Sequence, residues 1–306
     1  MPEQGRKFVV IGGAGVVGSA VSSALITQHG GNVVICDRFR STNSRKWANI
    51  PIAIDDIWSA DNLIENLNKS WRDIAGVVLL ADAGHASQDC DAIFEAAFHL
   101  PRRIWDYCAA KQRPLYWASS SHVYGAGQSH LSTAPQDVAA LNPVTAFGRA
   151  KLAFDIFAAR QGTGPDAPPI WAGYRLSSVY GRTEAHKGDL ASLPVRSMQA
   201  AHNETELRVA HKISRDWVHV DDAACALASL VVGQHAGFFD IGTGTTTTTA
   251  DLIASVENVV GKGLKTTVGD VSNEAIISLP AANMTALADA GVSVQFQTLA
   301  QGLASL

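Results

Sequence analysis

The chain has 306 residues, of which 47% are apolar and 17% are charged, a balance typical of a folded globular protein and unlike that of a disordered or fibrous one. Its formal net charge of −4 excludes a dedicated nucleic-acid-binding protein, because neutralising phosphates requires clustered lysine and arginine. The sequence shows no signal segment, no apolar run near the ~18 residues of a membrane span and no cysteines at metal-ligand spacing. We therefore expect a cytoplasmic protein with free thiols, no membrane contact and no metal site.

Short apolar runs alternate with helical stretches over the first 180 residues. We expect strands at residues 7–11, 32–36, 51–54, 76–81, 115–119 and 170–176. Alternation of this kind indicates βαβ units. The runs are apolar throughout, as is typical of strands that helices cover on both faces. The pattern predicts an α/β fold with a doubly wound parallel sheet.

A glycine-rich turn follows the first expected strand and opens the first expected helix. Glycines allow a tight turn and close approach of a pyrophosphate, whose charge the amides at the helix N-terminus stabilise. Asp37 ends the next strand, where an acidic residue binds the adenosine ribose. Together these features predict a Rossmann dinucleotide-binding domain. Its predicted cofactor-binding residues in the turn and the second strand are Gly12, Gly15, Val16, Val17, Gly18 and Asp37.

Two opposing signals bear on which nicotinamide cofactor binds. Asp37 favours NAD, whereas cations near it can hold the extra phosphate of NADP. Arg38 and Arg40 follow Asp37 at once, and Arg45 and Lys46 come shortly after. These residues could instead be solvated surface charges. We expect NADP, with Arg38 and Lys46 in its site, and keep NAD as the alternative.

The strand and helix rhythm loosens after Tyr180. We expect a helix through Met198, strands at residues 207–210 and 237–242, and a helix at 250–260 that the threonines of the 245–249 run precede and cap. This predicts a smaller α/β substrate-binding lobe formed by residues 181–210 and 251–306. The Rossmann domain would then comprise residues 1–180 and about 211–250.

Four segments carry a resemblance to a known enzyme family. They are Ser-Ser-Ser-His-Val-Tyr-Gly at 119–125, Tyr-Gly-Arg-Thr-Glu-Ala-His-Lys-Gly at 180–188, Ser-Arg-Asp-Trp-Val-His-Val-Asp-Asp at 214–222 and Phe-Asp-Ile-Gly-Thr-Gly at 239–244. The first, third and fourth resemble extended short-chain dehydrogenases/reductases that act on nucleotide sugars. The second is similar to the ADP-glyceromanno-heptose 6-epimerases, and the likeness extends over nearly the whole chain. Residues 46–50 also resemble that family's segment with a lysine for the NADP phosphate.

The resemblance implies an epimerase that inverts C6 of an ADP-linked heptose. Bound NADP would oxidise the C6 hydroxyl and return hydride to the other face of the ketone, with no net redox change. Each face needs its own proton donor and acceptor, because one side chain cannot reach both. In the family these are the Tyr of a Tyr-x-x-x-Lys helix and the Lys of the His-Lys-Gly segment, here Lys187. The resemblance also implies a homo-oligomer, possibly a pentamer, with an ADP-sugar as its partner.

The tyrosine of this pattern is missing from its expected place. Tyr107 and Lys111 have the right spacing but precede the serine strand, so we expect Tyr107 to be a packing residue of a helix. The position that opens the helix after that strand is Phe147, followed one turn later by Lys151. Phenylalanine cannot pass a proton, and losing such a group costs on the order of 10² to 10⁴ in rate. The predicted catalytic residues are Ser120, Phe147, Lys151 and Lys187, and Lys151 can also bind the nicotinamide ribose.

Further residues are predicted on the substrate side. Arg215 suits the substrate diphosphate, because its planar fork binds phosphate oxygens in pairs, although a structural pair with Asp216 or Asp221 is the alternative. Ser87 and His186 could contact substrate or be ordinary loop residues. With Ser120 and Lys187 they complete the predicted substrate site.

Several interpretations stay open at this point. Phe147 is either an engineered substitution that traps substrate or natural divergence, and the retained Ser120, Lys151 and Lys187 favour the former. The sugar could be another nucleotide sugar. The chain could also be a dehydrogenase that releases reduced cofactor, or a non-catalytic dinucleotide-binding protein.

Overall fold

A computed structural model of the chain describes residues 5–39, 44–82, 89–126, 131–210, 213–269 and 277–306, and its centre is a seven-stranded sheet. All neighbouring strands of the sheet run parallel, in the order β11-β6-β5-β4-β1-β2-β3. The order reverses at β1 and β4, the switch point at which open sheets of this kind bind ligands. The doubly wound α/β prediction is confirmed. The strands are β1 (Lys7–Ile11), β2 (Asn32–Asp37), β3 (Asp56–Ser59), β4 (Ile74–Leu79), β5 (Leu115–Ser120), β6 (Trp171–Leu176) and β11 (Gly237–Ile241).

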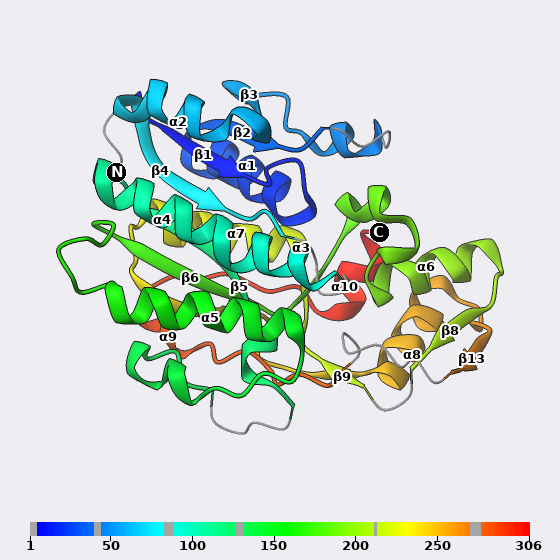
Figure 1. Cartoon of the computed structure of the whole chain (residues 1–306). Coiled ribbons are helices and arrows are strands. Elements are labelled where there is room, and N and C mark those ends of the chain that lie inside the picture. Colours follow the sequence, from blue (N-terminus) through cyan, green and yellow to red (C-terminus); the bar gives the residue numbers. More distant parts are fainter. Residues whose placement is uncertain (1–4, 40–43, 83–88, 127–130, 211–212, 270–276) are drawn as a thin grey trace.

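Helices cover both faces of this sheet (Figure 1). One core joins Phe8 and Val10 to α1 (Val16–His29) and α7 (Val220–Val232). The other joins Val9 and Ile11 to α2 (Leu63–Ser70), α4 (Leu100–Lys111) and α5 (Ala146–Gln161). Successive strand residues face opposite sides, so strands covered on both faces are apolar at most positions, with buried Arg175 in β6 and Asp240 in β11 as exceptions. Within the described ranges, no helix is both long and apolar enough to cross a bilayer.

The expected third strand is wrong in position. Residues 51–54 lie outside any strand, and the edge strand β3 begins at Asp56. Pro51 has no N–H to donate to a ladder, and the side chain of Ile52 is fully exposed. In β3 only Trp58 is buried, so the strand lacks the continuous apolar run that marks the central strands. β4 likewise begins two residues before the expected strand at 76–81.

A second hydrophobic cluster lies beside the main sheet. Figure 1 shows its elements gathered at one side of the molecule. They are α6 (Leu193–Asn203), β8 (Leu207–Val209), α8 (Thr249–Val260) and α10 (Leu299–Ala304), and the exposed strand β13 (Thr266–Val268) pairs with β8. The Oγ1 of Thr248 caps α8 by accepting from the Asp251 N–H at 3.1 Å, as the threonine run predicted.

Two further short strand pairs lie outside the main sheet. β7 (Ser178–Tyr180) pairs with β10 (Trp217–His219), and β9 (Ser214–Arg215) pairs with β12 (Thr247–Thr248). The helix α9 (Thr285–Asp289) buries its own Leu287 in the core around α1 and α7. This differs from the expectation that residues 251–306 belong to the smaller lobe. The division into two domains stays a prediction.

Candidate active site

The glycine turn between β1 and α1 is shaped for a phosphate-containing ligand. Gly12 has a φ of 85°, and a Cβ on it would lie 2.5 Å from the backbone N of Ala81. A Cβ on Gly18 would overlap the carbonyl oxygen of Gly12. No side chain caps α1 at Gly15, and its first turn has no acidic residue, so its amides present positive potential to an anion. These residues fit the pyrophosphate of a dinucleotide.

Gly18→Ala is expected to destabilise this turn. The added methyl group must displace the Gly12 backbone, and overpacking of this kind lowers the free energy of unfolding by about 1–3 kcal/mol. Gly263→Ala is the matched control, because the nearest atom to its Cβ is 3.8 Å away. Urea unfolding of both variants measures the difference. Equal midpoints would show that the turn is less tightly packed than the structure indicates.

Asp37 joins the turn to the segment that follows β2. Its buried carboxylate accepts from the Ala14 N–H at 2.9 Å and from Lys46 Nζ at 2.5 Å. Lys46 lies in the short helix η1 (Ser44–Asn49), whereas the neighbouring Arg38 is exposed. The structure thus brings the predicted ribose-binding acid and the predicted phosphate-binding lysine together. The lysine balances the charge of the Asp37 carboxylate.

Three predicted catalytic residues meet at the carboxyl end of β5. Ser120 ends β5, and Phe147 lies in the first turn of α5, which Thr145 caps by accepting from the Gly148 N–H at 3.0 Å. One turn later, Lys151 Nζ lies 5.5 Å from the centroid of the Phe147 ring. The side chains of Ser120, Phe147 and Lys151 are 7%, 6% and 5% exposed, so all three lie in a shielded region.

Two neighbours of this group were not predicted from the sequence. Lys151 Nζ donates to the carbonyl oxygen of Ala118 at 2.7 Å and lies 3.1 Å from Oδ2 of Asp82. The ring of His122 meets the Phe147 ring edge-on, with centroids 5.5 Å apart. Asp82 follows the apolar run of β4, and that position at the carboxyl end of a strand was the signal that could have identified it.

Lys187 and His186 lie on η7 (Arg182–Leu190), a short helix that packs against η1 and α1. Lys187 Nζ lies 3.5 Å from Oε2 of Glu184. Glu184 is buried and also accepts from the backbone N–H groups of Gly181 and Ser192, at 3.2 and 2.7 Å. The structure therefore holds Lys187 against its own helix through the pair with Glu184.

Arg215 is buried on β9, and this burial lowers its pKa to about 10. Its guanidinium donates to Ser178 Oγ at 3.4 Å. The expected alternative partner Asp216 instead accepts from the backbone N–H groups of Thr243, Gly244 and Ala282, at 2.9, 2.9 and 3.0 Å. Ser87 lies outside the described residues.

Tyr107 is a packing residue, as predicted. It is buried on α4 and donates to the carbonyl oxygen of Leu67 at 2.7 Å. Burial raises its pKa to about 12. A tyrosine held in this way is remote from the carboxyl ends of the strands and cannot replace the hydroxyl that Phe147 lacks.

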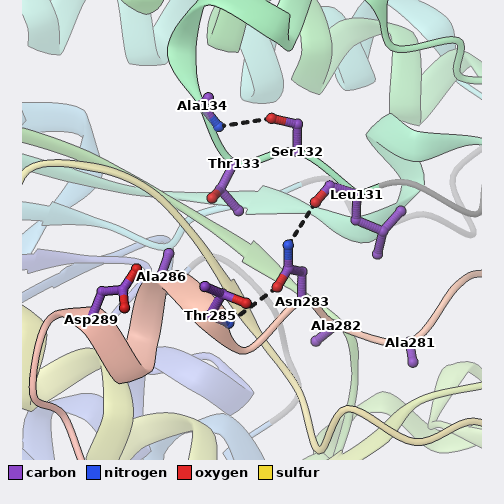
Figure 2. A pocket seen from close by; sticks show the side chains of 10 residues that line it. All are labelled: Leu131, Ser132, Thr133, Ala134, Ala281, Ala282, Asn283, Thr285, Ala286 and Asp289. Atoms are coloured by element: carbon purple, nitrogen blue, oxygen red, sulfur yellow. Dashed lines mark hydrogen bonds between the residues drawn. The ribbon is translucent and has the colours of Figure 1, made fainter.

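A groove of about 570 Å³ lies elsewhere, between residues 131–134 and 281–289 (Figure 2). Asn283 Nδ2 crosses it to donate to the carbonyl oxygen of Leu131 at 2.7 Å. Behind it, the Asn283 N–H donates to Asp240 at 2.9 Å, and Asp240 accepts from Tyr124 Oη at 2.7 Å. The residues that line the groove come from these two segments, and none of them is a predicted site residue, so the groove is separate from the predicted site.

Comparison with known proteins places these features in a family. Residues 8–242 match the model of the NAD dependent epimerase/dehydratase family. ADP-L-glycero-D-manno-heptose-6-epimerase of Fusobacterium nucleatum is 27% identical over 261 residues, which are 80% of this chain and 77% of the relative. The solved structure of ADP-L-glycero-D-manno-heptose-6-epimerase of Helicobacter pylori superimposes with a TM-score of 0.81 at 18% identity, covering 99% of this chain and 95% of the other.

A further solved structure has a tyrosine replaced by phenylalanine. It is a mutant of UDP-glucuronic acid 4-epimerase from Bacillus cereus in complex with UDP-4-deoxy-4-fluoro-glucuronic acid and NAD. It superimposes with a TM-score of 0.80 at 20% identity, covering 98% of this chain and 97% of the other. At these identities the two solved structures show that the fold is shared.

Proposed function

Because the chain belongs to the NAD dependent epimerase/dehydratase family, we propose that it is a nucleotide-sugar epimerase that inverts C6 of an ADP-linked heptose. The name of the Fusobacterium nucleatum relative supports the substrate. We further propose NADP as the cofactor, supported by the pairing of Lys46 with Asp37. In this chain the reaction is slow, because Phe147 stands at the place of the catalytic tyrosine.

One observation carries this proposal. Phe147 and Lys151 lie one helical turn apart beside the end of β5, with Lys151 Nζ 5.5 Å from the aromatic ring. This is the arrangement of a Tyr-x-x-x-Lys helix in which the ring is kept and the hydroxyl is missing. The buried surroundings are intact, so the site can bind and orient ligands although one proton-transfer group is absent.

Each residue has a separate task in this proposal. Residues of the glycine turn, with Asp37, Arg38 and Lys46, hold the cofactor, which when bound supplies the hydride acceptor and donor. Lys151 orients the nicotinamide ribose, and Ser120 hydrogen-bonds the sugar hydroxyl. Lys187 exchanges the proton on one face of C6, whereas Phe147 leaves the other face without a proton carrier.

Residues outside the cofactor site bind the rest of the substrate in this proposal. Arg215 contacts the diphosphate, and its low exposure strengthens that interaction, because a charge shielded from water attracts phosphate more strongly. Ser87 and His186 contact the sugar side. The tyrosine-to-phenylalanine epimerase mutant in complex with a sugar nucleotide supports the idea that a phenylalanine form keeps its ligands.

Incubation with C6-deuterated ADP-heptose and NADP at high protein concentration tests the function. We expect slow appearance of the C6 epimer by NMR, with deuterium retained at C6, because hydride leaves and returns to the same carbon. NADPH, followed by its absorbance, should not accumulate. Stoichiometric release of NADPH would identify a dehydrogenase instead, and loss of deuterium to water would exclude hydride transfer. Absence of both product and NADPH would count against the substrate.

A further inference from the structure

A single side-chain amide at the end of η1 touches both the cofactor turn and the segment that carries Lys187. The Nδ2 group of Asn49 donates to the carbonyl oxygen of Thr183 at 2.9 Å. It also lies 3.5 Å from the carbonyl oxygen of Ala14 in the glycine turn. Asn49 therefore links the glycine turn and η1 to a segment that lies 134 residues after Asn49 in the sequence.

His186 completes this link. Its Nδ1 lies 2.9 Å from the same Thr183 carbonyl oxygen and 3.2 Å from Asn49 Nδ2. A carbonyl oxygen accepts two hydrogen bonds, so Thr183 accepts from both Asn49 and the His186 ring. Burial lowers the pKa of His186, and the nearby cations Lys187 and Lys46 lower it further. Because a carbonyl oxygen can only accept, His186 Nδ1 carries a proton and donates a hydrogen bond to Thr183.

Asn49 joins η1, which carries a predicted cofactor-binding residue, to η7, which carries a predicted catalytic residue. η1 carries Lys46, whose ammonium pairs with Asp37 at 2.5 Å. η7 carries Lys187, and the Oγ1 of Thr183 donates to the carbonyl oxygen of Val16 at the start of α1, at 3.3 Å. A ligand that restrains η1 and the glycine turn thus also restrains Thr183 of η7, which is bonded to both.

We propose that Asn49 is a positioning residue that couples binding of the dinucleotide to the order of residues 182–190. A phosphate bound at Lys46 holds η1, and η1 holds Thr183 through the Asn49 amide. Ordering η7 in this way before the sugar arrives lowers the entropy cost of sugar binding. The role of Lys187 rests on the proposed function, but the tie between η1 and η7 does not depend on which sugar binds.

Amide hydrogen exchange of the full chain, measured by mass spectrometry with and without saturating NADP, tests this coupling. In the unaltered chain we expect NADP to slow exchange of residues 182–190 at least about 5-fold, the lower range of coupling between sites. In Asn49→Ala, NADP should still protect the glycine turn but change residues 182–190 less than about 2-fold, because the link is cut. Asn68→Ala removes an exposed asparagine amide from α2 and is the matched control, expected to behave like the unaltered chain.

Asn49→Leu keeps the volume of the side chain without its amide and should repeat the result of Asn49→Ala. Equal NADP protection of residues 182–190 in the unaltered chain and both variants would overturn the coupling. The coupling would also be overturned if the Asn49 variants exchanged residues 182–190 faster by the same factor with and without NADP, because that result indicates a merely structural role. Loss of NADP protection at the glycine turn in the Asn49 variants would overturn it as well. No sugar is added, so failure of the proposed epimerase function leaves this measurement unchanged.

Discussion

Phe147→Tyr is expected to raise the rate of C6 inversion of ADP-heptose at least tenfold, and up to the 10² to 10⁴ typical of general acid–base catalysis. The new hydroxyl extends from a ring that is already in place beside Lys151, whose ammonium lies 5.5 Å from the ring centroid. A nearby cation favours the phenolate and so eases proton exchange with the sugar oxygen. NMR detection of the C6 epimer at saturating NADP measures the gain.

Two controls separate this effect from a general change in the protein. Phe94→Tyr adds a hydroxyl to a ring that is 39% exposed on α3 (Cys90–Phe94) and should leave the rate unchanged. Phe147→Leu should stay as slow as the unaltered chain. If Phe147→Tyr binds NADP normally but gains no activity, the assignment of the active site to this position is wrong.

Asp155→Ala is expected to lower the free energy of unfolding by about 3–5 kcal/mol, the cost of leaving a buried charge without its partner. Asp155 and Arg175 have no exposed surface, and their carboxylate and guanidinium lie 3.2 Å apart. Asp155 also accepts from Ser119 Oγ at 2.8 Å and from the Trp117 ring N–H at 3.2 Å. Burial raises the pKa of Asp155, and Arg175 opposes this rise.

Urea unfolding monitored by circular dichroism measures this loss. Asp106→Ala is the control, because Asp106 pairs with Arg102 on the surface of α4 at 60% exposure, and exposed pairs contribute about 0–1 kcal/mol. Replacing the buried pair together, as Asp155→Leu with Arg175→Met, should recover part of the loss, since both charges are then removed. A small effect of Asp155→Ala alone would mean that water reaches Arg175 in the folded protein.

The central fold was predictable because its signals are local. The covered strands are mostly apolar, and the glycines of the first turn occur where strand and helix meet. β3 was misplaced because it is an edge strand whose only buried side chain is Trp58, so it lacks that signal. The assignment of Phe147 to the place of a catalytic tyrosine, which stays a prediction, also came from the sequence, through the order of the serine strand and the next helix.

The sequence by itself determined the sheet, the cofactor turn and the identity of residue 147. Only the tertiary structure decided which distant groups meet: Lys151 with Asp82, Asp37 with Lys46, and Asn49 with Thr183. It also showed that Lys187 pairs with Glu184 on its own helix. The physical reason is the range of the signals. Periodicity and turn residues constrain the chain over one or two helical turns, whereas these side-chain contacts depend on how the crossover connections bring separate segments to one edge of the sheet.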